Sequence, residues 1–299
     1  MNSQRKLSYQ AIMEVSEGNH GWKSILLDHI GVSRQALNKF LHHRKTDWEH
    51  KNDLLTEVVL KTYKDHFQRI GAGKILSHIT KEHLLDFEVT YYQVRRVMRS
   101  EGISCKSKAK KRSRKDDNDQ HEKDNVLNQN FEVEKPNMVW LSDSTQLEFG
   151  IKETHKVKLS GILDLCSRKI IGSFISPSET AEAEIAMFKE TFEEMGDVHP
   201  MVHTDRGPAF TAVSFNKLLD EHKVIRSFSR PGTPYDNSPM ESWWSNFKGI
   251  WMDSHPRPAT LEALIKLVQD GIDYFNNIDR LPTKNGLTPE ECWNKAIAK

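Results

Sequence analysis

The chain has 299 residues, of which 37% are hydrophobic and 28% charged, and its net charge is +1. This length allows two or three domains with their own cores, and the nearly neutral charge gives no global sign of nucleic-acid binding. Its three cysteines, Cys105, Cys166 and Cys292, are scattered and give no disulfide framework or zinc pattern. No apolar stretch approaches the ~20 residues of a membrane span, and the N-terminus lacks the apolar segment of a signal peptide. We therefore expect a cytoplasmic protein.

Residues 1–50 are predicted to form a helix-turn-helix-like domain. Apolar residues recur at helical spacing on both sides of Gly31, which supplies the turn, and Ser33 is a typical helix N-cap. The second helix would expose four side chains that can reach base edges or phosphates: Arg34, Gln35, Asn38 and Lys39. A helical hairpin with a polar face, without a DNA-binding role, explains the same pattern.

Residues 51–105 are predicted to form a second helical, DNA-binding-like domain. Thr90 is a suitable cap for its last helix, which would bury Val94, Val97 and Met98 and present Arg96 and Arg99 outside. A packing helix with a solvated basic face is the alternative.

Residues 106–135 are predicted to be a basic and polar linker. A basic run from Lys106 to Lys115 is followed by acidic residues between 116 and 119. Such a run is usually solvated, although it can contact nucleic acid where a DNA-handling domain adjoins it.

The hydrophobic period changes in residues 136–299. Strands are predicted near 139–141, 157–165, 170–175, 201–203 and 224–228, and helices near 180–195, 215–219 and 261–275. Three strands followed by alternating helices and strands indicate a mixed α/β domain that ends in a helical segment.

Three acids stand out in this region. Asp143 follows the first predicted strand, Asp205 follows the fourth, and Glu241 lies in the first turn of a helix. Each has a structural alternative, because an aspartate at a strand end is often a turn residue. For Glu241 the alternative is a capping box with Ser238 at the N-cap and Pro239 at the first helical position.

The sequence motifs that surround these acids occur in a fixed order. They are Val139-Trp140-Leu141-Ser142-Asp143, Leu163 to Gly172, His203-Thr204-Asp205-Arg206-Gly207 and Tyr235 to Ser242. They resemble the catalytic core of the IS-three family of insertion-sequence transposases, within the retroviral-integrase superfamily. The 35 residues between Asp205 and Glu241 match the spacing of that superfamily.

The resemblance reaches beyond the core and covers nearly the whole chain. Gly31-Val32-Ser33, Val94 to Ile103 and Leu287-Thr288-Pro289 resemble segments of the second reading-frame product of that family. Two segments depart from the family pattern, Ser144-Thr145-Gln146 after the first acid and Pro208-Ala209-Phe210 after the second. The histidine common near the family's C-terminus is also replaced, around Leu281-Pro282. None of these departures removes an acid.

The resemblance implies a ribonuclease-H-like fold and a DDE-type transposase. Asp143, Asp205 and Glu241 would be the catalytic and metal-binding residues. Carboxylates suit Mg²⁺ or Mn²⁺, and two such ions can assist an in-line phosphoryl displacement. The enzyme would cleave and transfer DNA strands at insertion-sequence ends and target DNA. A nuclease that only hydrolyses DNA and a DNA-binding regulator remain alternatives.

Partners and location follow from the same resemblance. The protein is expected to form a homo-oligomer on DNA and to work with an upstream reading-frame product, as a fusion or a partner. The resemblance also implies a bacterial, nucleoid-associated protein.

Supporting residues are predicted around the acids. Lys248 follows Glu241 by seven residues, two helical turns along the same face, and could bind a DNA phosphate. His203 and Asn237 could orient substrate. The structural alternatives are a solvated lysine, a packed histidine and a turn asparagine. Asp164 is a rival acid, which we interpret as a structural cap before a turn.

Overall fold

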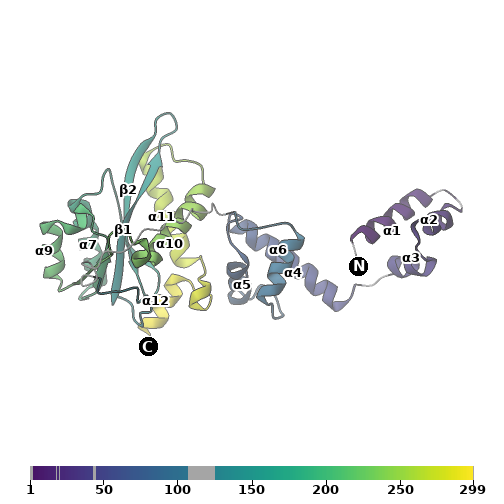
Figure 1. The fold of residues 1–299 in the computed structure, drawn as a ribbon, viewed down its shortest axis with the longest axis horizontal. Helices are drawn as coiled ribbons and strands as arrows, with labels where there is room; N and C mark the ends of the chain where they lie inside the picture. Colours follow the sequence, from purple (N-terminus) through teal and green to yellow (C-terminus); the bar gives the residue numbers. More distant parts are fainter. Residues whose placement is uncertain (1–2, 18, 20, 43–44, 107–124, 299) are drawn as a thin grey trace. The chain divides into compact units, whose positions relative to one another are not determined.

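The computed structural model describes residues 3–17, 19, 21–42, 45–106 and 125–298 (Figure 1). The chain divides into two compact units, Met1–Leu54 and Leu55–Lys299. Residues 107–124, which hold most of the predicted basic and acidic linker, lie outside the described residues. Among the described helices, none has both the length and the apolar character needed to cross a bilayer.

The first unit contains the predicted helix-turn-helix. Its helices are α1 (Ser3–Ser16), α2 (Trp22–Ile30) and α3 (Arg34–Leu41). Gly31 ends α2 in the left-handed conformation with φ 69°, which glycine adopts without steric cost. Ser33 Oγ accepts a hydrogen bond from the Ala36 amide at 3.1 Å and caps α3. The predicted glycine turn and serine cap are confirmed. Four buried side chains form the core of this unit: Tyr9, Ile12, Leu27 and Leu37.

The second unit begins within α4 (Asp47–Asp65), which is followed by α5 (Ala72–Lys81) and α6 (Tyr91–Ser100). Thr90 and Gln93 form a capping box at the start of α6, as the sequence predicts for Thr90. The predicted inner residues Val94, Val97 and Met98 are buried, and Arg96 and Arg99 are exposed.

A five-stranded mixed sheet forms the centre of the remaining chain. Its strands are β1 (Val139–Phe149), β2 (His155–Asp164), β3 (Ile170–Ser176), β4 (Met201–Thr204) and β5 (Ile225–Phe228). The spatial order is β3-β2-β1-β4-β5. The first three strands pair antiparallel, whereas β4 pairs parallel with β1 and β5 parallel with β4. The predicted ribonuclease-H-like mixed sheet is confirmed.

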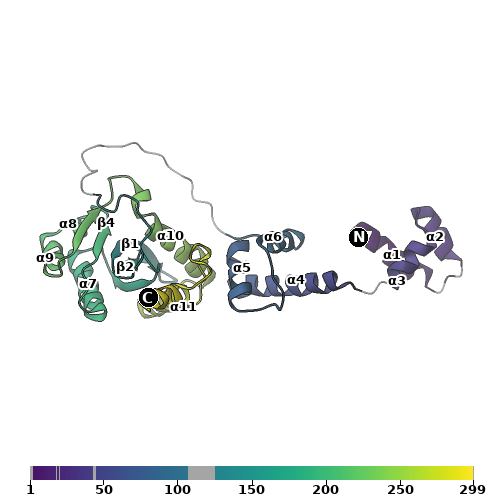
Figure 2. The same cartoon turned by 90° about the horizontal axis from the view of Figure 1, so that it is seen from below.

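Helices cover both faces of this sheet (Figures 1 and 2). One face carries α7 (Ala181–Met195), α8 (Pro208–Thr211) and α9 (Val213–Glu221). The other carries α10 (Ser238–Asn246) and α11 (Leu261–Asn277), and α12 (Pro289–Ile297) follows.

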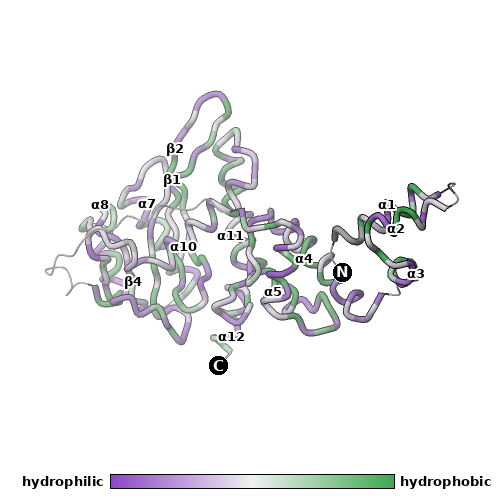
Figure 3. The backbone as a smooth tube through the Cα atoms, turned by 45° about the vertical axis from the view of Figure 1, so that its right-hand side comes forward, coloured by the Kyte–Doolittle hydropathy of each residue, from purple (hydrophilic) through white to green (hydrophobic). Residues whose placement is uncertain are grey.

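Successive residues of β1 enter different cores, because neighbouring side chains of a strand point to opposite faces. Trp140 belongs to the core cluster with Phe188 of α7, and Leu141 to the cluster with Met240 of α10. The hydropathy colouring of Figure 3 shows green, hydrophobic stretches along β1 and β2.

The α4–α6 segment contacts the sheet domain within the second unit. His66 Nδ1 lies 2.5 Å from the Tyr274 hydroxyl, and Lys74 Nζ lies 2.6 Å from Asp279 Oδ1. Most of the residues predicted as a separate second helical domain thus share one compact unit with the sheet domain.

The end of the predicted linker also lies against the sheet domain. Asn125 and Gln129 donate side-chain hydrogen bonds to Asp236 at 2.9 and 2.7 Å, and Leu127 is buried. Leu127 belongs to the core of the sheet domain, and Phe131 and Val133 pack against it, so the segment removes apolar surface from water and satisfies a buried carboxylate.

Candidate active site

Parallel pairing places the first two acids side by side. The register of β1 and β4 aligns Leu141 with His203. Asp143 comes two residues after Leu141 on β1, and Asp205 comes two residues after His203, in the loop just past the end of β4, near enough for their charges to interact. Asp143 is half-buried and Asp205 is exposed.

The third acid approaches on α10. Gly161 is the register partner of Asp143 on β2. A Cβ at Gly161 would lie 3.1 Å from Met240 Cε and 3.2 Å from Trp244 Cη2, so the absence of a side chain lets α10 pack close to the sheet. Asp143 and Glu241 consequently line one cavity of about 590 Å³.

The start of α10 differs from the prediction. The N-cap is Asn237 rather than Ser238, and no side chain caps the helix. The predicted Ser238 N-cap is therefore wrong, and no capping box involving Glu241 forms. The physical reason is the 3₁₀ turn at Pro234–Asn237, which runs directly into α10 and brings already helical backbone up to Ser238.

The acids repel one another. Burial raises the pKa of Asp143 to about 7, with further contributions from the negative charges of Glu241, Asp205 and Glu179. Within the part of the chain that the structure describes, no three acidic, histidine or cysteine side chains stand close enough to hold a metal ion. The three carboxylates are thus near one another but do not form one group of metal ligands.

Two further carboxylates near the site escaped prediction. Glu179 is half-buried in the connection that leads to α7, and Glu184 is fully buried on that helix, where it accepts a hydrogen bond from Ser160 Oγ at 2.5 Å. Burial raises the pKa of Glu184 to about 7, and the nearby Glu179, Asp143 and Asp205 add to the rise. A sequence signal existed for Glu184, which shares a helix face with Met187 and Phe188.

Lys248 lines the same cavity as Glu241. It lies in a π-helical turn, Phe247–Trp251, rather than in the regular α-helix assumed in the prediction. Arg69 of the α4–α5 connection lines this cavity too, and its Nη1 donates to the Gly249 carbonyl at 2.5 Å. The second helical segment therefore forms part of the cavity wall.

His203 is enclosed between strands. Its Nδ1 lies 2.8 Å from Ser227 Oγ and its Nε2 lies 2.9 Å from Ser229 Oγ, and the side chain is fully buried. Burial lowers the pKa of His203 to about 4. Since both ring nitrogens are engaged, the geometry favours the packing role over contact with substrate.

Asn237 and Asp164 occupy different surroundings. Asn237 is buried beside the start of α10, and its Oδ1 has no hydrogen-bond partner among the described residues. Asp164 accepts hydrogen bonds from the Ser167 amide and hydroxyl and from the Asn137 amide. These bonds make Asp164 a structural cap, as its sequence context indicates.

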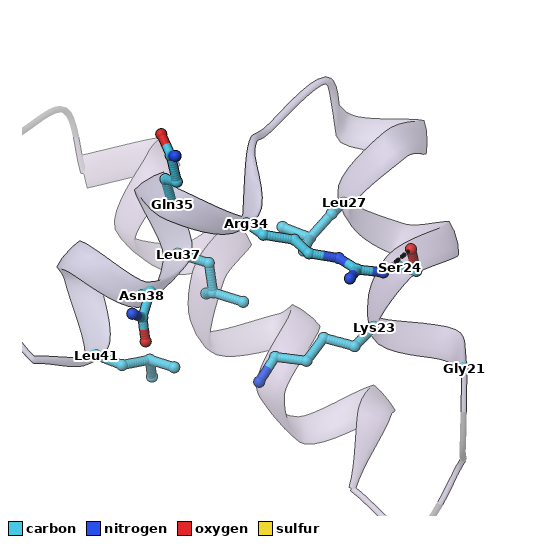
Figure 4. Close-up of a pocket in the computed structure, with 9 residues that line it drawn as sticks. All are labelled: Gly21, Lys23, Ser24, Leu27, Arg34, Gln35, Leu37, Asn38 and Leu41. Carbon is cyan, nitrogen blue, oxygen red and sulfur yellow. Dashed lines mark hydrogen bonds between the residues drawn. The ribbon is translucent and has the colours of Figure 1, made fainter.

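The predicted DNA-binding residues lie on three surfaces. In the first unit, Arg34, Gln35 and Asn38 line a cavity of about 540 Å³ between α2 and α3 (Figure 4). Arg34 Nη2 donates to Ser24 Oγ at 2.7 Å across this cavity. Lys39 is exposed on α3 outside the cavity lining, and Arg96 and Arg99 are exposed on α6.

A mixed sheet with one acid on β1, a second just past β4 and a third on the covering helix α10 has the layout of an integrase-type catalytic core. The Integrase core domain family matches residues 133–234, a range that includes Asp143 and Asp205 and ends before Glu241. An uncharacterised transposase-like protein of Haemophilus influenzae is 30% identical over 203 residues, which cover 68% of this chain and 92% of that protein. The chain belongs to the IS-three family of insertion-sequence transposases, enzymes of the polynucleotidyl-transferase type.

Two further proteins are similar to parts of this chain. The transposase for insertion sequence element IS904 of Lactococcus lactis is 27% identical over 247 residues, covering 79% of this chain and 92% of that protein. The solved HTLV-2 integrase catalytic core domain in complex with magnesium is 18% identical, with a TM-score of 0.42, over 53% of this chain and 97% of that one.

Proposed function

We propose that this transposase cleaves and joins DNA strands with Asp143, Asp205 and Glu241 as the ligands of two divalent ions, Mg²⁺ or Mn²⁺. The observation that supports the proposal is the proximity of three carboxylates from three parts of the fold: Asp143 and Glu241 line one cavity, and Asp205 is near enough to raise the pKa of Asp143. Such mutual repulsion costs stability unless a cation offsets it.

The side chains fit the proposed metal by their chemistry. All three donors are carboxylate oxygens, which Mg²⁺ and Mn²⁺ prefer. Asp205 Oδ1 accepts a hydrogen bond from the Gly207 amide at 2.8 Å, so the loop orients this carboxylate. When bound, the ions supply Lewis-acid activation of the attacking oxygen and stabilisation of the leaving oxygen.

The same site serves cleavage and joining. In cleavage, the oxygen of water bonds to the phosphorus and one bridging oxygen of the strand leaves. In joining, the 3′-hydroxyl of the cut strand replaces water, attacks a target phosphate, and again one bridging oxygen leaves. The protein holds the strand, and we assign phosphate contact to Lys248, which lines the cavity with Glu241.

We assign recognition of insertion-sequence ends to the first unit. Arg34, Gln35, Asn38 and Lys39 would contact bases and phosphates, and Arg96 and Arg99 on α6 would add phosphate contacts. Pairing of two ends requires more than one copy of the chain, so a homo-oligomer on DNA is part of the proposal, together with an upstream reading-frame product.

A strand-transfer assay with a pre-cut element end tests this function. We expect Mg²⁺- or Mn²⁺-dependent nicking of an uncut end and joining of the pre-cut end to target DNA. Asp143→Asn, Asp205→Asn and Glu241→Gln should each abolish both reactions while the protein stays folded. Nicking without joining would identify a hydrolytic nuclease, and DNA binding with neither reaction would identify a regulator.

A further inference from the structure

A fourth carboxylate touches the strand of the first catalytic acid. Glu179 directly precedes Thr180, the N-cap of α7. Its Oε2 accepts hydrogen bonds from Ser144 Oγ at 2.7 Å and from Lys158 Nζ at 3.2 Å. Ser144 follows Asp143 on β1, so Glu179 is bonded to the immediate neighbour of a proposed metal ligand.

The other oxygen of Glu179 lies at the loop of the second acid. A Cβ built on Gly207 would stand 3.3 Å from Glu179 Oε1 and 3.0 Å from Asp205 Oδ1. Both carboxylates thus come close to Gly207, where a side chain would crowd them. Glu179 therefore reaches both the strand that carries Asp143 and the loop that carries Asp205.

Lys158 offsets the charge of Glu179. It lies on β2, and the two side chains retain relative exposures of only 32% and 24%. An ion pair that is mostly shielded from water is screened less than a surface pair. The pair thus combines one negative charge close to the catalytic acids with one positive charge further along β2.

We propose that Lys158 and Glu179 act as a positioning pair that sets how strongly the three acids bind divalent metal. Glu179 adds attraction for the cation and holds the Asp143 strand against the Asp205 loop, and Lys158 limits that attraction. The inference rests on the proposed metal-dependent function. It predicts opposite effects from the two halves of one ion pair, which loss of a merely structural contact would not produce.

The test measures metal binding by the full-length protein without DNA. The shift in Tm is recorded against Mg²⁺ and Mn²⁺ concentration for wild type, Glu179→Gln, Lys158→Met and the double variant. Glu179→Gln should raise the concentration for half of the shift by about three- to tenfold, and Lys158→Met should lower it by about two- to fivefold, from the removal of one nearby charge. The double variant should lie close to wild type.

A remote ion pair supplies the matched control. Lys266 and Asp270 form an exposed pair on α11 with an N–O distance of 3.6 Å. Lys266→Met and Asp270→Asn should leave the metal concentration for half of the shift unchanged.

Three results would overturn the inference. They are equal metal response in all variants, a change in the same direction for Glu179→Gln and Lys158→Met, and no response of wild-type Tm to metal. Nicking of element ends is measured in parallel. If nicking stays metal-dependent in these cases, only the positioning pair is refuted; if wild type neither binds metal nor cuts DNA, the proposed function fails as well.

Discussion

Replacing Asp143 with asparagine should stabilise the metal-free protein at alkaline pH. The amide keeps the shape of the carboxyl group and removes the charge that burial, Glu241 and Asp205 oppose. In the folded protein the pKa of Asp143 rises from 3.8 to about 7. The Asp143 carboxyl group ionises near the lower value in the unfolded chain and near the higher value in the folded protein. Between them the folded state binds more protons, so its stability falls as pH rises from about 4 to about 7.

The size of the expected stability difference depends on the pH range that an experiment can cover. Between pH 5.5 and pH 8 the folded protein must release the Asp143 proton. At ~1.4 kcal/mol per pKa unit this release costs about 2 kcal/mol of unfolding free energy. Glu184, whose pKa is also raised to about 7, mainly by burial, adds a loss of the same sign in wild type and variant.

Urea unfolding in the presence of a chelator measures this difference. Wild type should lose about 2 kcal/mol more stability between pH 5.5 and pH 8 than Asp143→Asn does. With saturating Mg²⁺ the order should reverse, because a cation that binds only the folded wild type stabilises it. Parallel pH profiles for the two proteins would refute the reasoning, since they would mean that Asp143 is already ionised at no cost.

Three other outcomes are expected. Lys248→Ala should weaken DNA binding and strand transfer at fixed salt, and Lys248→Arg should keep part of both. Metal-induced Tm shifts should stay the same in both variants. If the alanine variant behaves like wild type in both DNA assays, Lys248 is a solvated lysine. A fragment of residues 1–54 should bind element-end DNA with an affinity that falls as salt rises, and no binding even at low salt would contradict this unless an upstream partner restores it. His203→Ala should cost about 2–4 kcal/mol of unfolding free energy through a cavity and two lost hydrogen bonds, yet leave kcat per folded molecule near that of wild type; a lowered kcat at unchanged stability would instead place the imidazole in the reaction.

The sequence predicts the sheet domain well because local patterns determine it. Apolar runs at 139–141, 157–165 and 170–175 become β1, β2 and β3, and two short runs become β4 and β5. Gly31 and Ser33 also act locally, since a left-handed turn and an N-cap each depend on one residue. Such short-range interactions can be predicted directly from the sequence.

Features that depend on distant contacts leave a weaker signal. Glu179 reaches the site only because the β3–α7 connection folds back to Ser144, 35 residues away. The π-turn that carries Lys248 has no motif of its own, and Arg69, which lines the same cavity, lies 180 residues from its acceptor at Gly249. Residues 125–131 look like a continued linker until Asp236 is seen to accept their amide hydrogen bonds.

The structure bears on the two roles that the sequence leaves open for Glu241. A glutamate three residues after a serine is a good capping-box residue, and a helix would benefit from it there. The helix starts one residue earlier than such a box requires, no side chain caps it, and the glutamate instead raises the pKa of a neighbouring aspartate. A residue that gives its helix no cap and adds charge repulsion beside Asp143 lowers the stability of the metal-free protein. Carboxylates arranged at such a cost are typical of sites where a cation or a reaction uses them, and this favours the catalytic role over the structural one.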